Sequence, residues 1–81
     1  MTLYRVSRMD RDGFGKTSDA TESVDEARRL MDTFKLLPMA YIVGLLSMSN
    51  RGRPTDTWQP RAVYMRTSAG WWEIPQGRKE L

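Results

Sequence analysis

The chain has 81 residues, enough for one domain but close to the length at which a single hydrophobic core is only marginally sufficient. It contains no cysteine and no histidine, which excludes disulfides, thiolate nucleophiles, Cys/His zinc sites and serine-histidine-aspartate triads. A net charge of +3 permits binding to phosphate or to an acidic protein surface but requires neither. We therefore expect a single domain over residues 1–81 that holds no cofactor and no metal.

The chain gives no signal for a membrane. Its first residues mix charged and apolar side chains, so they predict neither a secretory signal nor an anchor. The longest apolar run, residues 36–46, is interrupted by Pro38 and is too short to cross a bilayer. These features indicate a soluble, cytoplasmic protein without a membrane partner.

The first predicted elements are a strand and a helix. Residues 3–9 predict a strand, with Tyr4 and Val6 on one face. Ser23 and Glu26 fit the capping box, in which the serine side chain binds an amide of the first turn and the glutamate returns to the serine amide. Apolar residues follow at helical spacing until Pro38, so we predict a helix over residues 24–36.

The second half predicts three further strands. Residues 39–48 are apolar on both alternating faces, as in a central strand covered on two sides, although a buried helix is the competing interpretation. Residues 61–67 and 71–74 predict a hairpin through residues 68–70, after a polar loop at 49–60 and before a loose tail at 78–81. The predicted fold is α+β: a small two-layer β-α-β-β-β domain with one helix on a mainly antiparallel four-stranded sheet.

The stretch DRDGFGKTSD, residues 10–19, partly matches three functional motifs. A P-loop needs an earlier glycine where Asp10 stands, and a calcium loop needs a closing glutamate where Thr21 stands. An RNA-recognition strand needs stacking aromatics beyond the Gly-Phe-Gly core, and these are missing. We therefore expect only a turn, in which the glycines supply positive φ and Phe14 tucks under the helix.

A second stretch resembles a known DNA-binding peptide. Arg51, Gly52, Arg53 and Pro54 resemble the core of the AT-hook family, whose extended chain lies in the narrow minor groove of AT-rich DNA. The resemblance implies that the two arginines run along the groove floor. Asp56 departs from the basic flanks usual in that family, and a solvated loop tip explains the same four residues.

The sheet itself offers a third candidate site. If Ala40 and Gly44 face the helix together with Ile42 and Leu46, then Tyr41, Val43 and Leu45 lie on the opposite face. Depending on register, further aromatic and arginine side chains join that face, because one helix cannot cover both sides of the sheet. They are Arg5, Tyr64, Arg66 and one of Trp71 or Trp72. Such a surface can bind a second copy, another protein or nucleic acid.

No catalytic constellation is recognisable, so we expect a protein that is not an enzyme. Without histidine or cysteine, catalysis would rest on a carboxylate pair, and no such pair stands out.

The strand MTLYRVSR, the helix SVDEARRLMD and the hairpin resemble small accessory proteins of phages of GC-rich actinobacteria. That resemblance implies binding to a host protein.

The leading expectation is a homodimeric binding module that contacts its partner through protein surfaces. We expect the partner-binding residues to be Tyr41, Tyr64, Arg66 and Trp71 on the sheet and Trp58 at the end of the preceding loop. The alternative is a DNA-binding protein that uses Arg51, Gly52, Arg53 and Pro54.

Overall fold

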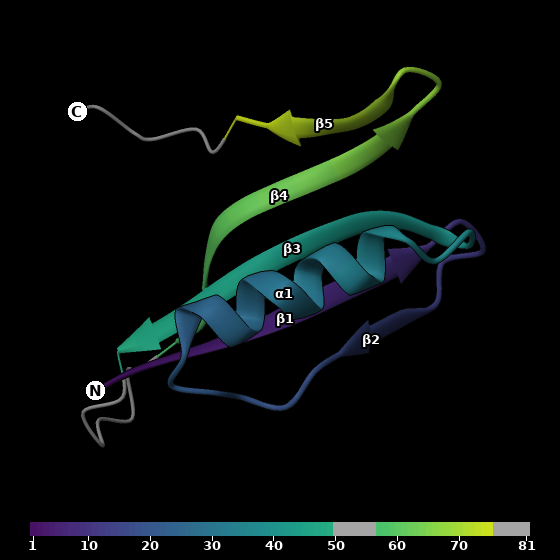
Figure 1. Ribbon diagram of the computed structural model, residues 1–81. Coiled ribbons are helices and arrows are strands. Elements are labelled where there is room, and N and C mark those ends of the chain that lie inside the picture. The colour runs from purple at the N-terminus through teal and green to yellow at the C-terminus, as the bar shows by residue number, and fades with distance from the viewer. Residues whose placement is uncertain (50–56, 76–81) are drawn as a thin grey trace.

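The computed structural model describes residues 1–49 and 57–75. In these ranges the elements are β1 (Thr2–Asp10), β2 (Gly15–Thr17), α1 (Val24–Lys35), β3 (Ala40–Ser49), β4 (Gln59–Thr67) and β5 (Gly70–Ile74). The strands form one antiparallel sheet in the order β2-β1-β3-β4-β5, and α1 lies on one face of it (Figure 1). The predicted two-layer α+β fold is confirmed, and the sheet has one more strand than expected.

The additional strand comes from the glycine-bearing stretch after β1. The Gly13 amide donates to the Asp10 carbonyl at 3.0 Å, and Gly13 has a φ of 92°, so the predicted turn is confirmed at this point. Residues Gly15–Thr17 then pair with β1 as the short edge strand β2. Phe14 does not tuck under the helix, because its side chain is 71% exposed at the tip of this hairpin.

Helix α1 begins as its sequence predicts. The Ser23 side chain accepts a hydrogen bond from the Glu26 amide at 3.1 Å, which satisfies one of the free donors of the first turn. The capping box predicted that the Ser23 amide donates to the Glu26 side chain. In the structure this amide donates to the Thr21 hydroxyl instead, at 3.1 Å. Leu36 caps the other end, one position after the last helical residue, Lys35.

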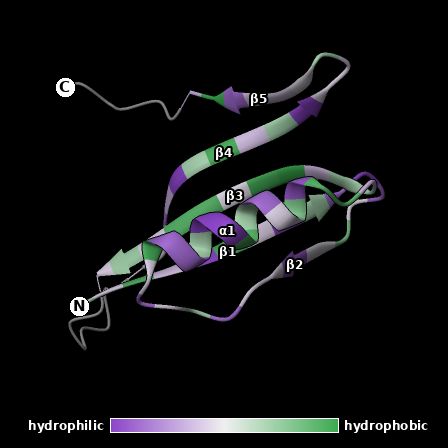
Figure 2. Ribbon diagram, viewed as in Figure 1, coloured by the Kyte–Doolittle hydropathy of each residue, from purple (hydrophilic) through white to green (hydrophobic). Residues whose placement is uncertain are grey.

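The core lies between α1 and the two strands beneath it, β1 and β3. Its buried apolar side chains are few and mostly small: Val6, Ala27, Met31, Ala40, Val43 and Leu45. At one end of the helix, the Arg8 guanidinium lies over the Phe34 ring and pairs with Asp10 at 2.8 Å. Figure 2 shows the same division, with β3 largely hydrophobic and α1 alternating between apolar and polar residues.

The β4–β5 hairpin extends beyond the helix, as Figure 1 shows. Two side chains tie it to the C-terminal end of α1. The Arg66 guanidinium donates to the carbonyls of Lys35, Leu37 and Ala40, and the Trp71 indole donates to the Lys35 carbonyl at 3.3 Å. The Lys35 carbonyl is in the last turn of α1, where carbonyls have no partner within the helix. Within the described residues, no helix is long and apolar enough to cross a membrane.

Candidate functional site

Strand register divides the side chains of the sheet between two faces, and one face has no helix. Val6 lies opposite Leu45, and both are buried under α1, so the positions that alternate with them point to the other side. We call that other side the open face. Its apolar side chains are Leu3, Met9, Ile42, Leu46, Met48, Val63, Met65, Trp72 and Ile74.

The open face is uncovered by any element of the described part of the chain. All the helical residues described belong to α1, which lies on the opposite side of the sheet (Figure 1). Two of the open-face side chains are about half exposed: Met9 at 47% and Trp72 at 50%. A contiguous apolar surface of this kind is typical of an interaction site.

The middle of the open face is formed by small residues. Ser7, Gly44 and Val63 lie side by side across β1, β3 and β4. On one side of this row lies a row of large side chains, Met9, Ile42, Met65 and Trp72, contributed by the same strands and β5. We call this second row the ridge, and its two methionines can adapt readily to a partner's shape.

Arg5 is the one charged side chain on the open face within residues 1–49 and 57–75. Its guanidinium lies 4.2 Å from the centroid of the Trp58 ring. This contact places Trp58 at the margin of the open face, and the ring stabilises the cation. The Arg5 Nε atom is buried and has no hydrogen-bond partner among the described residues.

The face assignment expected for β3 is wrong. Val43 and Leu45 are buried against α1, whereas Ile42, Gly44 and Leu46 lie on the open face. Both sets are apolar, so the alternation in the sequence did not show which set the helix covers, and a shift of one residue exchanges the two faces. Small side chains allow the helix to lie close to the sheet: Ala27 on α1 and Ala40 on β3 are both buried.

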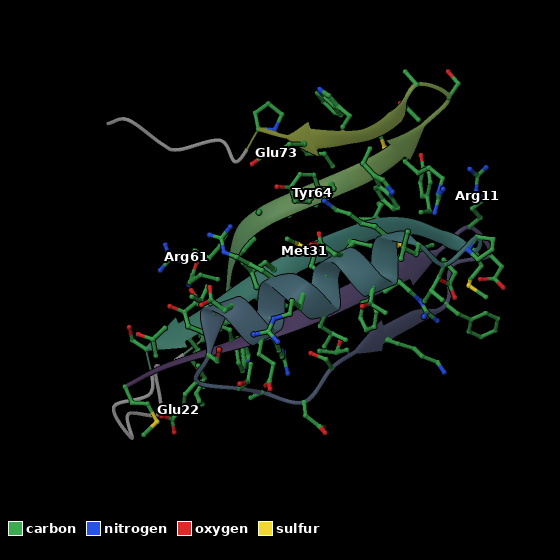
Figure 3. All side chains as sticks on the ribbon, viewed as in Figure 1. Arg11, Glu22, Met31, Arg61, Tyr64 and Glu73 are labelled. Atoms are coloured by element: carbon green, nitrogen blue, oxygen red, sulfur yellow. The ribbon has the colours of Figure 1, made fainter. Side chains whose placement is uncertain are left out.

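The expected grouping of Tyr64, Arg66 and Trp71 with Arg5 is also wrong, because these three side chains lie on the helix side. The Lys35 ammonium lies 3.5 Å from the centroid of the Tyr64 ring, and the Arg66 guanidinium lies 4.7 Å from that of Trp71. Figure 3 shows Tyr64 on β4, beyond the helix that carries Met31. These residues hold α1 to the sheet, and it is Trp72 that joins Arg5 on the open face.

Tyr41 lies apart from both groups. The register between β1 and β3 shifts between Met9 and Asp10, so Met9 pairs with Ile42 and Asp10 pairs with Ala40. Tyr41 is the extra residue of this bulge. Its ring faces Arg11, whose guanidinium is 5.8 Å from the ring centroid, and the two residues line a shallow hollow of about 290 Å³.

The remaining sequence candidates are the AT-hook-like stretch and the carboxylates. Arg51, Gly52, Arg53 and Pro54 lie outside the described residues, as does the tail at 78–81. Among the described residues, no three histidine, cysteine, aspartate or glutamate side chains gather where they could hold a metal ion. The Asp10 carboxylate is paired with Arg8, and the Asp12 carboxylate accepts from the Phe14 amide in the turn.

The sequence reasoning missed the ridge of Met9, Ile42, Met65 and Trp72. Each of these residues could be placed on a strand, but only the pairing of β1, β3, β4 and β5 brings them into one row. The available signal was that residues 42–46 are apolar on both alternating faces, which requires cover on both sides.

No protein-family model matches this chain, and the searches found no similar curated protein and no similar solved structure.

Proposed function

We propose that this protein is a non-enzymatic binding module that acts through the open face of its sheet. The observation that carries the proposal is the apolar surface of β1, β3, β4 and β5 that no described element covers. Aromatic residues, methionine and arginine are enriched in protein interfaces, and this face carries Trp72, several methionines and Arg5.

The composition of the face favours a protein over a nucleic acid. A surface that binds phosphates needs several cations, and the open face offers Arg5 alone, already stacked on Trp58. A protein partner with an apolar surface, by contrast, would pack against Met9, Met65 and Trp72, none of which carries a charge that must be desolvated. If the partner is not a second copy of this chain, the resemblance to phage accessory proteins implies that it is a host protein.

The experiment that tests this proposal is photo-crosslinking in cells that express the protein. A photoreactive amino acid replaces Met9 on the open face or Met39 in the α1–β3 connection, two positions of nearly equal exposure at 47% and 49%. We expect protein adducts, to a second copy or to another protein, from position 9 and few from position 39. Equal yields at the two positions would contradict the proposal.

The alternative function is DNA binding through Arg51, Gly52, Arg53 and Pro54. The same experiment can detect it. Nucleic-acid adducts in place of protein adducts would favour it. No observation on the described residues supports it, so we give it second place.

A further inference from the structure

We propose that the occupant of the open face is a second copy of this chain, which packs sheet against sheet in a two-fold symmetric dimer. This inference rests on the proposed function and names the partner of the same surface. It follows from the size of the uncovered surface, from its charge and from the position of its one cation.

The chain exposes more area than a compact monomer of its mass. A compact monomer of 9.4 kDa is expected to expose about 5,000 Å², and the chain exposes 5939 Å². The difference is about 900 Å², comparable to the ~800 Å² that each partner buries in an interface of standard size. Because the total includes residues 50–56 and 76–81, this difference is an upper limit for the open face.

The core of one chain is also incomplete. Within residues 1–49 and 57–75 it consists of six buried apolar residues, two of them alanines, on the helix side of the sheet. Domains of this length commonly obtain part of their burial by oligomerisation. A second sheet at the usual spacing of about 10 Å would bury the methionine ridge and supply the missing layer.

The charge distribution makes the open face compatible with a copy of itself. The face is apolar and carries one cation, so it does not require a partner with a complementary pattern of charges. Gly44 lies in the middle strand and in the central row of the face, whereas Arg5 lies one row and one strand away. A two-fold axis that passes over Gly44 and runs along β3 places β1 of one copy against β4 of the other, so the two Arg5 side chains stay apart.

The first test needs no substitution. The protein is labelled at its methionine methyl groups, and its mass is measured by light scattering over a range of concentrations. A soluble paramagnetic agent is then added, and relaxation of the Met9 methyl is compared with that of Met39. These two side chains are 47% and 49% exposed in one chain, so a monomer exposes them equally to the agent.

The expected result is a mass twice the 9.4 kDa of one chain, with Met9 protected and Met39 accessible. A monomer at all concentrations would overturn the inference, even with Met9 protected, because the cover would then come from the same chain. A dimer in which Met9 and Met39 relax equally would overturn it as well, because the contact would then lie elsewhere.

A matched pair of variants provides the second test. Met9→Glu places a charge on the open face and Met39→Glu places the same charge in the α1–β3 connection, at positions exposed enough for the monomer to tolerate both. We expect Met9→Glu to raise the dimer dissociation constant at least about ten-fold, and Met39→Glu to change it by less than about two-fold. Trp72→Glu should act like Met9→Glu, and circular dichroism confirms that each variant is folded. Equal effects of Met9→Glu and Met39→Glu would refute self-pairing through this face.

The self-pairing inference and the proposed function fail separately. A monomeric purified chain whose position 9 crosslinks to another protein in cells ends the inference and leaves the proposed function standing. A purified dimer that protects Met9, in a chain whose position 9 gives no preferential protein adducts in cells, ends the proposed function and leaves the inference about the purified chain standing.

Discussion

The guanidinium of Arg66 donates a hydrogen bond to the carbonyl of Leu37 at 2.8 Å, joining β4 to the chain that leaves α1. The same guanidinium reaches the Lys35 carbonyl at 3.1 Å and the Ala40 carbonyl at 2.9 Å. The C-terminal end of a helix carries partial negative charge and free carbonyls, which a planar cation can satisfy together. Arg66 therefore fixes the helix to the sheet.

Replacing Arg66 by methionine should lower the free energy of unfolding by about 2–3 kcal/mol, because several carbonyls lose a charged donor at once. Urea unfolding measures the change. Arg66→Lys should recover only part of the loss, since an ammonium group cannot reproduce the planar fork. Arg28→Met, at an exposed position on α1, is the control and should stay within about 0.5 kcal/mol of the wild type. An Arg66→Met variant as stable as that control would contradict the role assigned to Arg66.

The β4–β5 hairpin depends on the backbone of Gly70. Its φ of 117° is rarely adopted by residues with a side chain, although a Cβ atom there would meet nothing within 4 Å. Gly70→Ala should therefore cost about 1–3 kcal/mol through backbone strain alone. The control is Gly15→Ala, where the Cβ would lie at an ordinary 3.5 Å from the Arg8 carbonyl, with an expected change below about 1 kcal/mol. Thermal unfolding compares the two variants, and equal losses would contradict the strain argument.

The N-terminus of α1 depends on the Ser23 side chain. Ser23→Ala removes the acceptor of the Glu26 amide and should lower the free energy of unfolding by about 1 kcal/mol. Ser23→Asp keeps an acceptor at the same place and should stay within about 0.5 kcal/mol of the wild type. Chemical denaturation of the three proteins checks both values. Similar losses in the alanine and aspartate variants would show that the cap contributes little.

The proposed protein-binding function predicts little affinity for DNA. Light scattering of the chain with an AT-rich and a GC-rich duplex, at low and at moderate salt, should show no complex that survives moderate salt. A minor-groove reader would instead shift with the AT-rich duplex alone, and its affinity would fall steeply with salt. That result, abolished by replacing Arg51 and Arg53 with alanine, would favour the DNA-binding alternative.

Local signals in the sequence determined the elements of this fold. The helix start at Ser23, the strands near residues 3–9 and 39–48, and the hairpin at Gly70 follow from capping, alternation and turn chemistry, each of which acts over a few residues. The absence of histidine and cysteine likewise restricts the chemistry that the chain can perform, whatever its fold. The short strand β2 was missed because an exposed edge strand of three residues has no apolar pattern of its own.

Only the tertiary structure decided which face of the sheet the helix covers. Residues 42–46 are apolar on both sides, so the sequence offered two arrangements that differ by one residue in register. Pairing with β1 and β4 selected the arrangement that buries Val43 and Leu45 under α1 and leaves Ile42 and Leu46 on the open face. The interaction surface is set by this choice, because side chains from four strands become neighbours only through long-range pairing.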